Sequence, residues 1–301
     1  ALFLKDFLMS INNCKIIRTK SPDTFEELIN SLNSIVGKSI SELAKIANVP
    51  LPISTTHGKG FTGELLEIVL GATAENRPIP DFPKLGLELK TLPVDKNLLP
   101  LESTFFCHAP LTGIRHLNFE NSALYSKIKR VLFVVVTAQR DMNFEDRVIA
   151  GYFFFTPNEE QLNQIKSDFE ELYEMVKTGH VESINARIGQ IMQLRPKCAN
   201  GKALTDCTGR DGEIIKTRPR GFYMRRSFTK ELIERELKEK LRNRISLCSC
   251  VIILSGMYVS YSEWIDYEID TAISLGKPII GVKPRGHERI PSKVSNNADV
   301  M

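Results

Sequence analysis

The chain has 301 residues, of which 42% are hydrophobic and 25% are charged, values typical of a soluble globular protein and unlike those of a disordered or fibrous chain. The net charge is only +4, so total charge does not identify a partner. Six cysteines occur without a CxxC pair, and no histidine pair has zinc-finger spacing, which argues against a structural zinc site. Scattered cysteines in a chain of this length favour a reducing, cytoplasmic location over a disulfide framework.

The first ten residues, ALFLKDFLMS, are apolar but interrupted by Lys5 and Asp6. This stretch is too short to span a bilayer, and it lacks the basic start and small-residue exit of a signal peptide. We therefore expect a short buried helix and no membrane association.

Three helices are predicted in the first quarter of the chain. Ser21 as N-cap and Pro22 at the first helical position begin a helix that Gly37 ends. Ser39 and Glu42 have the spacing of a capping box and begin the second helix. A loop rich in Gly and Thr then leads into the third, ELLEIVLG.

The middle of the chain predicts strands. The run RVLFVVV is unbroken and apolar, as in a central strand covered on both faces, and VIAGYFFF predicts another strand. Thr156, Pro157 and Glu159 begin a long amphipathic helix that ends near Gly179. QIMQLRPK and GFYMRR predict two short strands around a polar loop, and a charged helix follows them.

The segment PDFPKLGLELKTLPVD contains the candidate catalytic residues. Leu87 and Leu89 alternate with Glu88 and Lys90, which predicts a half-buried strand with apolar side chains inward and polar side chains outward. Glu88 and Lys90 then point to the same side. Asp81, seven residues before Glu88, can return to that side from a turn.

Hydrolysis of a phosphodiester needs a hard cation and a water aimed at phosphorus, and two convergent carboxylates suffice to hold Mg²⁺. Lys90 could orient or deprotonate the water, or stabilise charge on the phosphorane. Glu67, on the preceding helix, could complete a second metal position. The alternative is a surface ion pair on a solvated strand face, because Asp followed by Glu-x-Lys also arises by chance.

Flanking sequence favours the metal site. The segment is preceded by KGFTGELLEIVLGA and followed in order by PLESTFFCHAPLTG, SKIKRVLF, TPNEE, RPKCANGKAL and RPRGFY. From about residue 22 to about residue 236 the chain resembles the MutH family, the GATC-specific nicking endonucleases of methyl-directed mismatch repair. Restriction enzymes that cut GATC share the same core and are the nearest alternative.

The resemblance implies an α/β fold with a restriction-endonuclease-like PD-(D/E)xK core and a two-lobed DNA cleft. Asp81, Glu88 and Lys90 would form the catalytic set, which Pro80 opens, and Glu67 would be the additional catalytic acid. The metal ligands would be the three acids, and the ion Mg²⁺, for which Mn²⁺ can substitute. The resemblance also implies a monomeric nuclease that acts on double-stranded DNA and is activated by MutL, with MutS upstream.

The resemblance further implies six DNA-binding residues. They are Lys59 at the DNA backbone, Phe105 against the bases, Lys127 near the cleavage site, Arg195 and Lys197 at base edges or flanking phosphates, and Tyr223 at the adenine methyl group.

A basic segment supports DNA binding independently. Residues 195–226 contain nine basic and three acidic residues, a concentration that the whole-chain charge hides. Such a segment suits phosphate contacts, although a solvated basic face is the alternative.

The C-terminal part departs from this pattern. CVIILS, SYSEWIDYEIDTAISLG and KPIIGVK predict a strand, a helix and a strand of parallel α/β type. The part resembles the C-terminal half of a Thoeris-type TIR-like domain, whose W-x-x-x-E acid would be Glu268. The first half of such a domain is missing, so we expect no nucleotide binding.

These observations predict an N-terminal extension at 1–20, an endonuclease domain at 21–238 and a partial TIR-like segment at 239–301. The leading hypothesis is a Mg²⁺-dependent endonuclease that nicks the unmethylated strand of hemimethylated GATC sites. One alternative is a GATC restriction endonuclease that cuts both strands. Another is a non-catalytic DNA-binding or NAD-related defence fusion protein.

Overall fold

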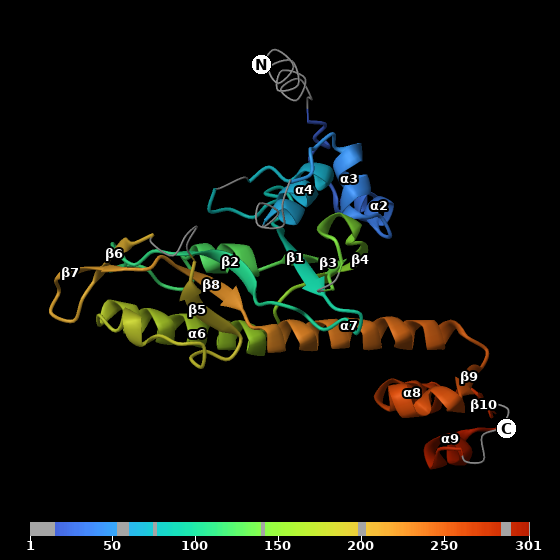
Figure 1. Ribbon diagram of the computed structural model, residues 1–301. Coiled ribbons are helices and arrows are strands. Elements are labelled where there is room, and N and C mark those ends of the chain that lie inside the picture. Colours follow the sequence, from blue (N-terminus) through green and yellow to red (C-terminus); the bar gives the residue numbers. More distant parts are fainter. Residues whose placement is uncertain are drawn as a thin grey trace. The chain divides into compact units, whose positions relative to one another are not determined.

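The computed structural model describes residues 16–52, 60–74, 77–139, 142–197, 203–283 and 290–300. The chain forms two compact units, Ala1–Lys230 and Glu231–Met301, and each is described by itself (Figure 1). The helix predicted for the first ten residues lies outside the described residues.

The first unit is built on a three-stranded sheet of order β1-β3-β4. Strand β1 (Glu88–Val94) runs parallel to β3 (Val131–Thr137), and β4 (Ile149–Phe155) runs antiparallel to β3. Every residue of β3 except Thr137 is buried, which confirms the prediction of a central strand covered on both faces.

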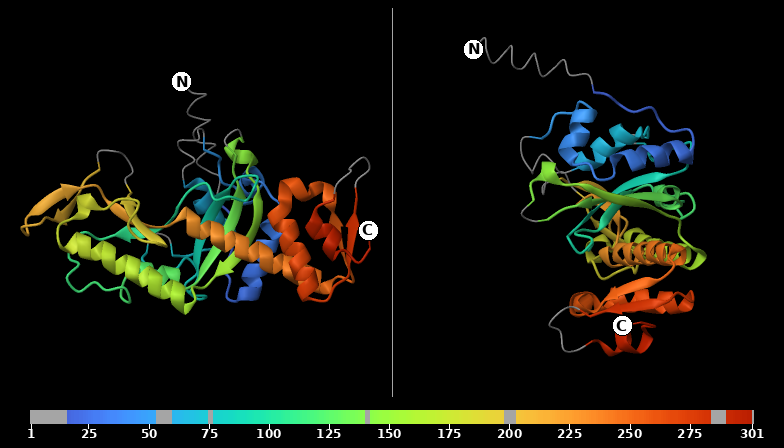
Figure 2. Two further views of the ribbon diagram at one scale, coloured as in Figure 1. Left: turned by 90° about the horizontal axis from the view of Figure 1, so that it is seen from below. Right: turned by 90° about the vertical axis from the view of Figure 1, so that its right-hand side faces the viewer.

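Helices α2 (Phe25–Ile35), α3 (Ile40–Ile46) and α4 (Phe61–Leu70) cover one face of this sheet (Figure 2). The predicted capping box of Ser39 and Glu42 begins α3, and the left-handed Gly71 (φ 76°) ends α4.

The first helix, α2, begins later than predicted, because Thr24 and not Ser21 is its N-cap. The Thr24 hydroxyl accepts a hydrogen bond from the Glu27 amide. The preceding chain is held away from helical geometry, since the Thr19 amide donates to the Ile68 carbonyl at the end of α4 (3.1 Å). A residue type suited to an N-cap is therefore not enough when tertiary contacts extend the backbone around it.

A second sheet has the order β2-β8-β5 and is antiparallel. Its strands are β2 (Thr104–Ala109), β8 (Arg220–Met224) and β5 (Met192–Pro196). Helix α6 (Glu159–Lys177) packs on one face, where Phe169 stacks on Phe222 with ring centroids 5.4 Å apart.

Two details of this region differ from the prediction. Helix α6 begins at Asn158, which forms a capping box with Gln161, and not at Thr156. The loop predicted between β5 and β8 contains a hairpin of β6 (Thr205–Thr208) and β7 (Ile214–Thr217). The shorter elements of this unit are helix α5 (Ala123–Ile128) and the 3-10 turns η1 (Phe144–Asp146) and η2 (Val181–Ser183).

Helix α7 (Arg226–Leu247) begins in the first unit and continues into the second. The second unit contains β9 (Val251–Leu254), η3 (Ser255–Met257), α8 (Tyr258–Ser274), β10 (Ile279–Val282) and α9 (Ser292–Asn297). Strands β9 and β10 are parallel, which confirms the predicted strand–helix–strand unit. A small core of buried residues, including Ile253, Ile269 and Ile279, lies within this unit.

Candidate active site

Strand β1 presents Glu88 and Lys90 on one side, as predicted. Their side chains form an ion pair, with the Lys90 ammonium 2.5 Å from a Glu88 carboxylate oxygen. Leu87 and Leu89 face the opposite way, into the core shared with α2, α3 and α4.

The prediction that the polar face of this strand is turned outward is wrong. Glu88 is 0% exposed, and Lys90 is only partly exposed. Neighbouring elements cover this face as well, because Lys127 of α5 and Phe106 of β2 both contact its polar side chains. A fully buried carboxylate must be held by charged or hydrogen-bonding partners, so this ion pair is not a solvated surface pair.

Lys127 supplies the main partner of Glu88. Its ammonium donates to both carboxylate oxygens, at 2.8 and 2.9 Å, and the residue is 9% exposed. The sequence suggested only a DNA contact here and missed the ion pair. One signal was present: Leu124 and Ile128 place Lys127 on the apolar face of a short helix, where a lysine needs a buried anion.

Asp81 reaches the same cluster from the turn before β1. Backbone hydrogen bonds between Phe82 and Leu87 close this turn. The Asp81 carboxylate, 6% exposed, accepts a hydrogen bond from the Leu89 amide at 2.8 Å. The turn therefore returns the acid to β1, as the spacing of seven residues predicts.

Glu67 lies on α4 and is half-buried, and its carboxylate interacts electrostatically with Asp81 and Lys90. Burial, followed by the negative charge of Asp81, raises the pKa of Glu67, and Lys90 opposes that rise. Burial alone would lower the pKa of Lys90, but the attraction of Glu88 and Asp81 outweighs it and raises the pKa. The four side chains that the sequence selected thus interact in one electrostatic cluster.

The donor set suits a hard cation that keeps part of its water shell. Among the described residues, no three acidic, histidine or cysteine side chains are arranged to hold a metal ion by themselves. The oxygens of Glu88 are engaged by two ammonium groups, whereas Glu67 and Asp81 repel one another. Mg²⁺ needs only one or two carboxylates besides water and substrate phosphate, so Asp81 and Glu88, with Glu67 beside them, fit such an ion.

Four of the predicted DNA-binding residues gather on the outer face of the β2-β8-β5 sheet, and we call them the aromatic–basic platform: Phe105, Arg195, Lys197 and Tyr223. The rings of Phe105 and Tyr223 are 5.3 Å apart. The Arg195 guanidinium lies 5.3 Å from the Tyr223 ring centroid, and the Lys197 ammonium lies 4.6 Å from that of Phe105. Lys59, the sixth predicted DNA contact, lies outside the described residues.

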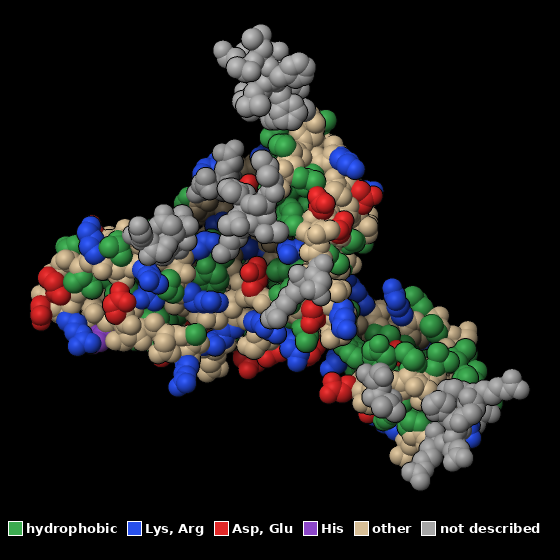
Figure 3. Space-filling view, in the orientation of Figure 1, with side chains coloured by type: hydrophobic (Ala, Val, Ile, Leu, Met, Phe, Trp, Pro, Cys, Tyr) green, Lys and Arg blue, Asp and Glu red, His purple; other side chains and the backbone are tan. Residues whose placement is uncertain are grey.

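The basic side chains of segment 195–226 fall into two groups, one that stabilises the fold and one that is exposed. Arg220 is buried and donates to the Val181 carbonyl, and Arg225 donates to the carbonyls of Ala186 and Ile188, so both hold the fold together. Other basic side chains of the segment are partly or fully exposed: Arg195, Lys197, Arg210, Lys216, Arg218 and Arg226. Lys and Arg side chains with hydrophobic side chains between them are spread over the visible face of the first unit (Figure 3).

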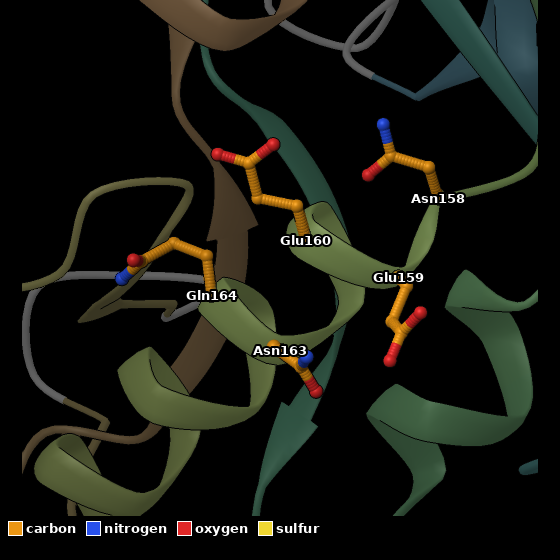
Figure 4. A pocket seen from close by; sticks show the side chains of 5 residues that line it. All are labelled: Asn158, Glu159, Glu160, Asn163 and Gln164. Atoms are coloured by element: carbon orange, nitrogen blue, oxygen red, sulfur yellow. The ribbon is translucent and has the colours of Figure 1, made fainter.

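A surface hollow at the start of α6 is separate from this chemistry (Figure 4). Its five lining side chains project in different directions from the first turns of the helix, and none belongs to the acidic cluster: Asn158, Glu159, Glu160, Asn163 and Gln164. Asn158 caps the helix and Gln164 donates to Asp168. We assign this hollow no function.

This fold and site define a class, the DNA endonucleases built on a restriction-endonuclease-like α/β core. Comparison with known proteins agrees. The family model described as DNA mismatch repair enzyme MutH matches residues 70–168. DNA mismatch repair protein MutH of Pectobacterium atrosepticum is 42% identical over 227 residues, which are 75% of this chain and 98% of that relative.

Two further relatives carry the same name. The protein of Shigella boydii serotype 18 is 45% identical over 71% of this chain and 93% of its own length, and that of Vibrio cholerae serotype O1 is 43% identical over 71% and 97%. The chain therefore belongs to the MutH family, and it is a DNA mismatch repair endonuclease.

The C-terminal part matches a different family model, that of the TIR-like domain of Thoeris protein ThsB, over residues 219–289. This match starts before α7 and so overlaps the end of the first unit. No helix among the described residues is long and apolar enough to cross a membrane.

Proposed function

We propose that this endonuclease nicks the unmethylated strand of hemimethylated GATC sites in a reaction that requires Mg²⁺. The observation that supports this most is the cluster of Asp81, Glu88 and Lys90 with Glu67 beside it. Each acid comes from a different position in the fold, and a purely structural ion pair would not need a third and a fourth charged group.

Asp81, Glu88 and Glu67 would hold the metal, with Mn²⁺ able to replace Mg²⁺. The bound ion would polarise the scissile phosphate and lower the pKa of a bound water. The attraction of Glu88 and Asp81 raises the pKa of Lys90 against the effect of burial, which favours the ammonium form over a general base. Its role is therefore to orient the water by hydrogen bonding and to stabilise negative charge that builds up on the phosphate oxygens.

Lys127 contributes through Glu88. Its ammonium compensates the buried carboxylate when no metal is present, so the site stays folded before DNA and metal arrive. Lys127 would also contact DNA near the cleavage site, as the family resemblance implies.

The aromatic–basic platform would read the target. Arg195 and Lys197 would contact base edges or flanking phosphates, Phe105 would press against the bases, and Tyr223 would sense the adenine methyl group. Their gathering on one sheet face supports this assignment. MutL as activator, MutS upstream, a monomeric state and a cytoplasmic location complete the proposal.

The central test replaces Lys90 by Ala. We expect the Lys90→Ala variant to bind a GATC duplex about as tightly as the unchanged protein but to lose cleavage with Mg²⁺ by roughly a factor of 10² or more. Lys84→Ala is a matched control, since Lys84 is exposed and pairs with Asp23. Equal nicking by Lys90→Ala and the unchanged protein would remove this cluster from catalysis.

The substrate is tested with unmethylated, hemimethylated and fully methylated GATC duplexes, each with and without MutL. We expect MutL-stimulated nicking of the unmethylated strand and no cleavage of the fully methylated duplex. Unaided double-strand cutting of unmethylated DNA would instead support a restriction endonuclease.

A further inference from the structure

Strand β2 contacts both the aromatic–basic platform and the catalytic cluster, by which we mean Glu67, Asp81, Glu88 and Lys90. The strand contains a bulge, because Phe105 is paired with Tyr223 and Cys107 with Phe222, so Phe106 is the extra residue. A bulge changes which way the following side chains point, and bulges occur often beside active sites. Here it makes two consecutive residues, Phe106 and Cys107, point inward, where they are 2% and 8% exposed.

The residues on either side of this pair point outward. The rings of Phe105 and His108 are 5.3 Å apart, and Phe105 also contacts the Tyr223 ring and the Lys197 ammonium. Neighbouring residues of one strand therefore belong to the platform and to the interior.

The inward pair forms a wall of the catalytic cluster. The Lys90 ammonium lies 5.5 Å from the centroid of the Phe106 ring, within the range of a cation–π contact. Cys107 is close enough to interact electrostatically with Lys127, Lys90 and Glu88, and burial raises the pKa of its thiol to about 12, so it remains a neutral part of the wall.

The cation–π contact can restrain the Lys90 ammonium in a way that its ion pair cannot. The Lys90 side chain is long and flexible, and its ion pair with Glu88 restrains the ammonium on one side. A bound metal that draws on the Glu88 oxygens would weaken that restraint. The Phe106 ring attracts the ammonium without competing for carboxylate oxygens, so it can keep Lys90 in place when metal and substrate are bound.

We propose that Phe106 is a positioning residue that holds the Lys90 ammonium for phosphodiester cleavage through the face of its ring, and that the β2 bulge links this contact to the aromatic–basic platform. The inference rests on the proposed catalytic role of Lys90. Phe105 precedes Phe106 directly in β2. Contact between a GATC site and Phe105 could therefore shift the Phe106 ring and, through it, adjust the position of Lys90.

The test lowers the negative electrostatic potential on the face of the Phe106 ring and leaves the shape of the ring nearly unchanged. Phenylalanine with one, two and three fluorine atoms is incorporated at position 106 of the full chain, because each fluorine weakens the negative face of the ring. We expect the single-turnover nicking rate on a hemimethylated GATC duplex with Mg²⁺ to fall stepwise, by roughly three- to tenfold for the trifluoro form. Affinity for the same duplex without metal should not change.

The same series at Phe155 is the control, since this ring is 0% exposed and packs on Phe133 and Phe228. A purely structural role for Phe106 predicts a flat nicking rate in both series. Phe106→Leu, which removes the ring face, should lower the nicking rate at least as much as trifluorination.

The outcomes separate the two proposals. If the unchanged protein nicks DNA and Lys90→Ala does not, but the fluorine series at Phe106 is flat, the positioning role is wrong and the proposed function stands. If Lys90→Ala nicks like the unchanged protein, both are wrong.

Discussion

At the scale of single residues, burial of charge decides the character of the active site. Glu88 is 0% exposed and has two ammonium partners, Lys90 and Lys127. Removing one partner of a buried ion pair leaves an uncompensated charge, which is costly, whereas exposed pairs contribute little. An arrangement of this kind is poorly suited to stability alone, which supports the metal-binding role that we propose for Glu88.

Asp168 is a second buried acid, with a structural task. It is 1% exposed, and its carboxylate accepts hydrogen bonds from the amides of Gln190, Ile191 and Met192 and from Gln164. These bonds fasten α6 to the start of β5, the strand that carries Arg195.

We predict that Asp168→Asn lowers the free energy of unfolding by about 2–4 kcal/mol. The asparagine side chain has only one acceptor oxygen, and its NH₂ group would face backbone N–H groups that also donate. Urea denaturation measures this change. Glu171→Gln on the same helix is the control, since Glu171 is exposed, and it should stay within about 0.5 kcal/mol of the unchanged protein. A similar loss in both variants would contradict the role of Asp168.

At the scale of elements, the β2-β8-β5 sheet depends on a glycine in its middle strand. A Cβ atom at Gly221 would lie 2.6 Å from the Phe105 ring and 3.1 Å from the Cys107 carbonyl oxygen. Glycine is therefore required for the Phe105 ring to pack against the backbone of β8, and the platform depends on this close contact.

Gly221→Ala should displace Phe105, cost roughly 1–3 kcal/mol of stability through overpacking, and weaken binding to a GATC duplex. Thermal unfolding and DNA titration check the two effects separately. Gly151→Ala on β4 is the matched control, because a Cβ there meets nothing within 4 Å. Unchanged DNA affinity in Gly221→Ala would show that Phe105 does not take part in binding.

At the scale of the whole molecule, the chain contains a MutH-like part and an additional unit. The P. atrosepticum relative is covered over 98% of its length by 227 residues of this chain, and the residues of the site all lie in the first unit. The second unit has a two-stranded parallel sheet and its own small core among the described residues.

We predict that a chain ending at residue 238 nicks hemimethylated GATC DNA at a rate within about twofold of the full chain, because domains with their own core act independently by default. The same assay on both chains measures this. A loss of more than tenfold would show that the second unit supports the nuclease. Consumption of NAD by the full chain would contradict the expectation that its TIR-like part is inactive.

Much of the fold followed from local sequence patterns. The apolar run of β3, the capping box at Ser39 and the glycine that ends α4 were all predictable, because each depends on neighbouring residues. The N-caps of α2 and α6 were misplaced, since several suitable residue types stand close together there and long-range contacts chose between them. The β6–β7 hairpin was missed because a polar segment with little apolar alternation gives a weak strand signal.

The sequence by itself determined the family, through a run of motifs in order, and the strand that carries Glu88 and Lys90, because their spacing follows from the two-residue period of a strand. Only the tertiary structure decided that Glu88 is buried, that Lys127 binds it, and that Phe106 lies against Lys90. These contacts join residues from separate elements, and the distances between such residues depend on packing and not on local sequence.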